Sequence, residues 1–168
     1  MNRWSEYAFV ALGSNLGDSR ALLGEAFLRL QALSDAPLLK SSLWKSSPVD
    51  CPPGSPDFVN AAAALAPRAG ETPESLLEKL QALEKEFGRR PKVILNEARP
   101  LDLDLIGFKG ETRATAALRL PHPRAHLRQF VLQPLAEIAP DLILPGQSHD
   151  IRGLQRALAS DERLERLP

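Results

Sequence analysis

The chain has 168 residues, equal numbers of acidic and basic side chains, and a hydrophobic fraction of 43%. This length and composition predict one globular domain with its own core. The zero net charge gives no bulk attraction to nucleic acid, and no apolar run is long enough to span a bilayer, so neither partner is expected. The single cysteine, Cys51, excludes an intrachain disulfide and a cysteine metal site, and it fits a reducing cytoplasm.

Residues 7–12 form a short apolar run that predicts a buried first strand. The next segment, 13–18, contains two glycines directly before a helix. Glycines in that position can cradle a phosphate, but their spacing matches neither the Walker pattern nor the dinucleotide fingerprint, which favours a tight turn. Asp18 or Ser19 can cap the helix expected over 19–33, where leucines recur at helical spacing.

Residues 37–49 alternate in a way that predicts a second strand, and residues 57–65 predict a third, although its alanines also permit a helix. If the third segment is a strand, Phe58 and Asn60 lie on the same face. An aromatic ring beside an amide can hold a flat heterocycle. A core phenylalanine and a turn-capping asparagine would explain the spacing equally well.

The clearest helix is expected over 73–87, with Thr72 as its cap, proline at its first position and Gly88 at its end. A basic segment, 89–92, follows at once. Its cations can favour the helix C-terminus, or they can form a clamp for phosphate.

The segment 100–106 alternates apolar and acidic residues with period two, which predicts a strand. Its leucines at 101, 103 and 105 then face the core, and Asp102 and Asp104 share the opposite face. Carboxylates about 7 Å apart along a strand repel each other and attract a cation. Mg²⁺, which typically takes one or two carboxylates plus phosphates, is the natural candidate, and Arg99 next door favours this over a surface strand whose acids face water.

The segment 112–136 contains four arginines, two histidines and no acid, so it attracts anions. Within it we expect a short strand at 118–120 and a helix or helical turns over 124–135. The helix is indicated by apolar residues at helical spacing, namely Leu127, Val131 and Leu135. The remaining tail predicts a strand at 142–144 and a helix over 151–159, and it carries no recognisable chemistry.

The β-α-β-β-α-β order of residues 7–106 matches a ferredoxin-like arrangement. We therefore expect an α+β fold: an antiparallel sheet with helices packed on one face, followed by a C-terminal extension.

Four separated motifs occur in register along the chain: ALGSNLGD (11–18), PDFVNAA (56–62), RPLDLDL (99–105), and LPHP (120–123) ahead of RQFVL (128–132). Together they resemble the 6-hydroxymethyl-7,8-dihydropterin pyrophosphokinase family of folate synthesis. The resemblance extends to about Pro145 and is far more specific than any one motif. Phe58 stands where tyrosine is frequent in the family, and Pro123 where an aromatic residue often follows the histidine.

The resemblance implies one pterin pyrophosphokinase domain over residues 1–168. Such an enzyme transfers the terminal pyrophosphoryl group of ATP to the pterin hydroxymethyl oxygen and releases AMP. It also implies two Mg²⁺ ions held by Asp102 and Asp104, with ATP as co-substrate. The expected partners are these small molecules alone, bound by a cytoplasmic monomer.

Site residues are carried over by position. The implied pterin-binding residues are Val49, Phe58, Asn60 and Phe130. The implied nucleotide- and phosphate-binding residues are Gln81, Glu84, Arg89, Arg99, His122 and Arg128. The implied catalytic residues are Arg89, Arg99, Asp102 and Asp104.

Two other functions remain open from the sequence. A ligand-sensing ferredoxin-like module would bind without turnover. An RNA-binding module would need exposed aromatics and a basic face, which 5% aromatic residues and zero net charge make the weakest alternative.

Overall fold

The structure is a computed structural model that describes residues 2–47, 52–88, 98–160, 162 and 164–168. The expected site residues Val49 and Arg89 lie outside this part. The elements of the main sheet and its helices are β1 (Ala8–Ser14), α1 (Ser19–Gln31), β2 (Leu39–Lys40), β3 (Trp44–Ser46), β4 (Phe58–Leu65), α2 (Pro73–Glu86), β5 (Asp102–Phe108), α3 (Gln129–Ile138), α4 (Ile151–Ala157) and β8 (Leu164–Arg166). A small hairpin of β6 (Arg113–Ala114) and β7 (Arg119–Leu120) and a 3₁₀ turn at Ala125–Leu127 complete the list.

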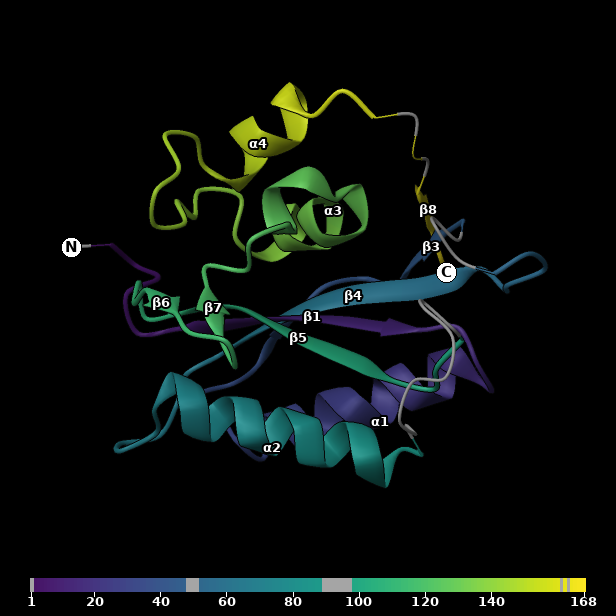
Figure 1. Cartoon of the computed structure of the whole chain (residues 1–168), viewed down its shortest axis with the longest axis horizontal. Coiled ribbons are helices and arrows are strands. Elements are labelled where there is room, and N and C mark those ends of the chain that lie inside the picture. Colours follow the sequence, from purple (N-terminus) through teal and green to yellow (C-terminus); the bar gives the residue numbers. More distant parts are fainter. Residues whose placement is uncertain (1, 48–51, 89–97, 161, 163) are drawn as a thin grey trace.

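The main sheet has the strand order β5-β1-β4-β3-β8, with β2 also paired to β4, and every pairing in it is antiparallel. The expected α+β, ferredoxin-like arrangement is confirmed. Helices α1 and α2 lie on one face, while α3 and α4 of the C-terminal extension lie on the other (Figure 1). Among the described residues, no helix has the length and apolar character needed to cross a membrane.

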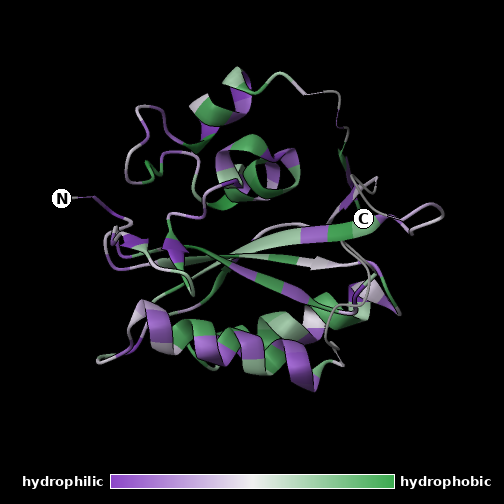
Figure 2. Cartoon of the chain, in the orientation of Figure 1, coloured by the Kyte–Doolittle hydropathy of each residue, from purple (hydrophilic) through white to green (hydrophobic). Residues whose placement is uncertain are grey.

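The sheet separates two cores because side chains alternate between its faces. Along β4, Ala61 and Ala63 join the core under α1 and α2, whereas Ala62 and Ala64 join the core under α3 and α4. Small side chains thus let both layers approach the same strand. Figure 2 shows the central strands largely in hydrophobic colours and both colours along α1 and α2, as expected for helices with one apolar side.

Local capping signals place the two helices of the first core. The Asp18 side chain accepts a hydrogen bond from the backbone N–H of Ala21 at 3.2 Å. At the start of α2, Thr72 and Ser75 form a reciprocal capping box. Each cap typically stabilises its helix by about 1 kcal/mol. Both helix starts could be predicted from the sequence because each capping bond closes within a few residues.

The prediction of one continuous strand over 37–49 was wrong: the described part holds two short strands, β2 and β3. Lys40 pairs with Ala63, and Trp44 pairs with Asn60. The chain thus advances four residues between β2 and β3 while β4 advances only three. The side chain of Ser41 causes the break, because its Oγ accepts the backbone N–H of Ala62 at 2.8 Å. This bulge sends the following side chains to the opposite faces.

The helical segment expected over 124–135 is divided in two. The 3₁₀ turn at Ala125–Leu127 comes first, the chain is extended at Arg128, and α3 begins only at Gln129. Leu127, at 60% exposure, is not a core position. Residues 142–144 are not a strand, although Leu142 and Leu144 enter the core by alternation, because this segment pairs with no strand in the described part. The tail instead supplies β8, which pairs with β3 and was not predicted.

Candidate active site

Strand register collects the predicted site residues on the face of the sheet that α3 covers. Asp102 of β5 pairs with Gly13 of β1, and Gly13 pairs in turn with Asn60 of β4. Cross-strand partners share a face, so these three residues form a row across the sheet. Asp104 lies one step further along the same face, opposite Ala11. The buried leucines that alternate with the two acids, at 101, 103 and 105, point into the other core, as the period of two predicts.

The acidic pair is crowded. Burial, the charge of Asp102 and the charge of Glu84 raise the pKa of Asp104 from 3.8 to about 7, although Arg128 and Arg99 oppose this shift. Two neighbouring carboxylates that are shielded from solvent favour binding of either a proton or a cation. In the described part of the chain, no group of three or more His, Cys, Asp or Glu side chains forms a complete metal site. A cation here would therefore need further oxygen ligands from a bound molecule.

Glu84 lies against the outer edge of β5. It is 8% exposed, and its Oε2 accepts the backbone N–H of Leu103 at 2.8 Å, between the two aspartates. β5 is the edge strand of the described sheet, so this bond satisfies a donor that no strand takes. The expected neighbour Gln81, one turn earlier on α2, is exposed, and its side chain makes no hydrogen bond to another described residue.

Two arginines approach the acids from different elements. The Nη1 of Arg99 lies 3.6 Å from Oδ1 of Asp102, and the Arg99 side chain is only 13% exposed. Its buried Nε has no acceptor in the described part of the protein. Arg128 immediately precedes α3, and its guanidinium lies 5.4 Å from the ring centroid of Phe130. The positive charges of both arginines act on the carboxyl of Asp104.

His122 offers one hydrogen-bond donor to this site. Its Nδ1 accepts the backbone N–H of Arg124 at 3.2 Å, which leaves the proton of the neutral ring on Nε2. Burial and then the positive charge of Arg128 lower the pKa of His122, against the opposing charge of Asp102. At neutral pH His122 is therefore a neutral donor.

The residues expected to hold a heterocycle lie at the other end of the row. Asn60, 3% exposed, donates through Nδ2 to Ser46 Oγ at 2.7 Å and to the Trp44 carbonyl at 3.3 Å. These bonds fix the amide so that Oδ1 remains an acceptor. Phe58, on the same face, and Phe130, in the first turn of α3, are each half-buried. The structure thus brings a ring and an oriented amide together on β4, as predicted for the strand alternative.

Asn15 lies beside the predicted site, and sequence reasoning did not single it out. It is 2% exposed. Its Oδ1 accepts the backbone N–H of Arg99, its own backbone N–H donates to the Arg99 carbonyl, and its Nδ2 donates to the Pro56 carbonyl at 3.4 Å. It therefore joins the segments that enter β4 and β5. The glycines around it suggested only a turn, and its presence in the first family motif was the one available signal.

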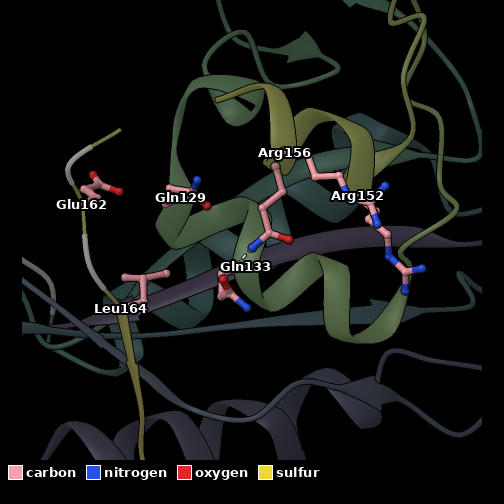
Figure 3. A pocket seen from close by; sticks show the side chains of 7 residues that line it. Gln129, Gln133, Arg152, Arg156, Glu162 and Leu164 are labelled. Atoms are coloured by element: carbon pink, nitrogen blue, oxygen red, sulfur yellow. Dashed lines mark hydrogen bonds between the residues drawn. The ribbon is translucent and has the colours of Figure 1, made fainter. Parts of the chain in front are cut away.

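A polar cavity of about 500 Å³ lies away from the row of acids, between α3, α4 and β8 (Figure 3). Its lining comprises Gln129, Gln133, Arg152, Gln155, Arg156, Glu162 and Leu164. None of the predicted site residues lines it, so this cavity does not identify the candidate active site. Side-chain chemistry identifies the row across the sheet instead.

Comparisons with known proteins find similar sequences over most of the chain. The family model described as 7,8-dihydro-6-hydroxymethylpterin-pyrophosphokinase matches residues 9–140. A Pseudomonas aeruginosa protein named 2-amino-4-hydroxy-6-hydroxymethyldihydropteridine pyrophosphokinase is 40% identical over 163 residues, covering 95% of this chain and 96% of its own. A Haemophilus influenzae protein of the same name is 40% identical over 139 residues, covering 82% and 84%.

Solved structures support the fold. A crystal structure of wild-type Plasmodium falciparum HPPK-DHPS with SDX-DHP superposes with a TM-score of 0.70 at 13% identity. The match covers 89% of this chain but 44% of that one, so this chain spans less than half of the longer protein. At this identity the similarity concerns the fold alone.

Proposed function

Because this chain belongs to the 7,8-dihydro-6-hydroxymethylpterin-pyrophosphokinase family, we propose that the row from Asp102 to Asn60 is the active site of an ATP-dependent pyrophosphokinase. The enzyme transfers the terminal pyrophosphoryl group of ATP to the hydroxymethyl group of 6-hydroxymethyl-7,8-dihydropterin and releases AMP. This reaction belongs to folate synthesis. We place it in a single domain that works as a cytoplasmic monomer.

The single observation that carries the assignment of the metal site is the strand register, which puts Asp102 opposite Gly13 and Asp104 opposite Ala11 on one face of the sheet. The raised pKa of Asp104 agrees with it. Two carboxylates on one face, destabilised when both are ionised, fit a hard divalent cation, and Mg²⁺ ligation by one or two carboxylates plus phosphates fits a site with few protein ligands. Asp102 and Asp104 would hold two Mg²⁺ ions. When bound, these ions supply positive charge to the phosphate oxygens and orient the nucleotide.

The surrounding donors suit a chain of phosphates. The buried Nε–H of Arg99 has no acceptor in the described residues, and a phosphate oxygen would satisfy it. Arg128 and the Nε2–H of His122 would donate to other phosphate oxygens, with Arg89, outside the described part, in the same role. Phosphoryl transfer needs in-line positioning and charge neutralisation more than covalent catalysis. These donors would supply both by holding the phosphate oxygens and neutralising their charge.

The pterin would bind at the Asn60 end. Its flat faces would stack between Phe58 and Phe130, and Asn60 Oδ1 would accept a hydrogen bond from the edge of the ring. Val49 is proposed as a further pterin contact on the resemblance alone. Glu84 would support β5 through the hydrogen bond that it accepts from the backbone N–H of Leu103. Gln81 is proposed to lie near the nucleotide.

Product analysis tests this function directly. The protein is incubated with ATP, Mg²⁺ and 6-hydroxymethyl-7,8-dihydropterin, and the nucleotides are separated by chromatography. We expect AMP in amounts equal to the pyrophosphorylated pterin, and no AMP without pterin or with excess EDTA. Formation of ADP, or binding without turnover, would contradict the proposal and favour another kinase or a ligand-sensing module. Sedimentation of the same sample checks the monomer.

A further inference from the structure

Gly13 occupies the middle of the row, yet its backbone does not require glycine. The glycines with positive φ are at 17, 54, 70, 88, 110 and 146, and Gly13 is not among them. It lies within β1, paired on both sides. Glycine inside a strand destabilises the fold relative to alanine, and it often marks a place where a ligand approaches the backbone closely.

Packing inside the protein does not require glycine at this position either. A Cβ added to Gly13 would lie 3.5 Å from Asn60 Oδ1 and 3.7 Å from Phe58 Cδ1, both ordinary van der Waals distances. Gly107 of β5 has neighbours at similar distances, Leu144 at 3.4 Å and Phe9 at 3.8 Å, but both belong to the core and not to the predicted site.

The two atoms nearest to the absent Cβ belong to the two β4 residues assigned to the pterin. We propose that Gly13 is a specificity-determining residue: the space left by its missing side chain is the floor on which a flat fused heterocycle lies. This inference rests on the proposed function. A methyl group would lift the ring from the sheet and lengthen its hydrogen bond to Asn60 Oδ1, while the acidic end of the row would keep its geometry.

The test compares Gly13→Ala with Gly24→Ala. Gly24 lies on the exposed side of α1, and a Cβ there meets nothing within 4 Å, so it is a matched glycine without a ligand. Thermal melts measure folding. Calorimetric titrations measure affinity for the pterin and for a non-hydrolysable Mg·ATP analogue.

For Gly13→Ala we expect an equal or higher melting temperature, Mg·ATP-analogue affinity within about twofold of wild type, and at least a tenfold loss of pterin affinity. Gly24→Ala should keep both affinities. Normal pterin binding by Gly13→Ala would overturn the inference, and so would its unfolding, because the fold is argued to accept the methyl group. If the wild-type protein forms AMP while Gly13→Ala binds pterin normally, only this inference fails; if the wild type forms no AMP, the proposed function fails.

Discussion

Asn15 and Arg99 hold each other through a reciprocal pair of hydrogen bonds. The backbone N–H of Arg99 donates to Asn15 Oδ1 at 2.9 Å, and the backbone N–H of Asn15 donates to the Arg99 carbonyl at 3.1 Å. The two residues are 84 positions apart in the chain. This pair fixes the start of the acidic strand against the end of β1, and with it the root of the Arg99 side chain.

We therefore expect Asn15→Ala to lower kcat by at least about tenfold and to destabilise the protein, because the part-buried N–H of Arg99 loses its acceptor, at a cost of about 1 kcal/mol. Pterin affinity should change less than kcat. Ser14→Ala is the matched control: the Ser14 hydroxyl bonds to that of Ser19 at 2.8 Å and not to Arg99. Kinetic measurements and thermal melts of both variants test this prediction. Equal losses of kcat in the two variants would argue against a positioning role for Asn15.

The raised pKa of Asp104 predicts how stability depends on pH. Its value of about 7 in the folded protein lies above the ordinary 3.8. Such a carboxyl stabilises the fold fully below its unfolded pKa, and the contribution is lost as pH rises through the folded pKa. Metal-free protein should therefore lose stability between about pH 4 and pH 8, and Asp104→Asn should reduce that loss.

Melts without metal at about pH 5 and about pH 8 test this prediction. Asp104→Asn should raise the melting temperature more at the higher pH, by several degrees at about 2–4 °C per kcal/mol. Turnover should fall by orders of magnitude in Asp104→Asn and in Asp102→Asn, while both variants stay folded. Near-normal turnover in both variants would refute the metal assignment.

The arginines should matter for chemistry more than for pterin binding. We expect Arg99→Ala and Arg128→Ala each to lower kcat by about 10²–10³-fold, because they meet charge that develops on the phosphates. Arg113→Ala is the control, because Arg113 lies in the same basic segment as Arg128 (residues 112–136) but pairs with Glu74 at 2.7 Å, outside the row. A purely structural role would instead lower the melting temperature and leave the activity of the remaining folded protein unchanged.

The aromatic pair should give an asymmetric result. Phe130→Ala should weaken pterin binding by about 3 kcal/mol, as for other aromatic truncations, and leave Mg·ATP binding nearly intact. Phe58→Tyr should be tolerated, because stacking needs only the ring. Titrations with pterin and with a non-hydrolysable ATP analogue measure both effects. Normal pterin binding by Phe130→Ala, or an equal loss of affinity for both ligands, would indicate that Phe130 only packs in the core.

Local patterns of the sequence alone determined much of this protein. The period of two in residues 100–106 placed the leucines in a core and the acids on the other face, because alternation is a property of any strand. Capping residues at 18 and 72 determined where α1 and α2 begin, because these hydrogen bonds close within a few residues. The order of the elements and the family motifs were enough to indicate the fold.

Only the tertiary structure decided which distant residues meet. The pairing of Gly13 with both Asp102 and Asn60, the clamp of Asn15 on Arg99 and the bond from Leu103 to Glu84 join separate segments. The bulge at Ser41 and the pairing of β8 with β3 likewise depend on neighbours far along the chain. Such contacts leave no periodic pattern in the sequence, because each one depends on how two segments pack and not on the residues adjacent to it.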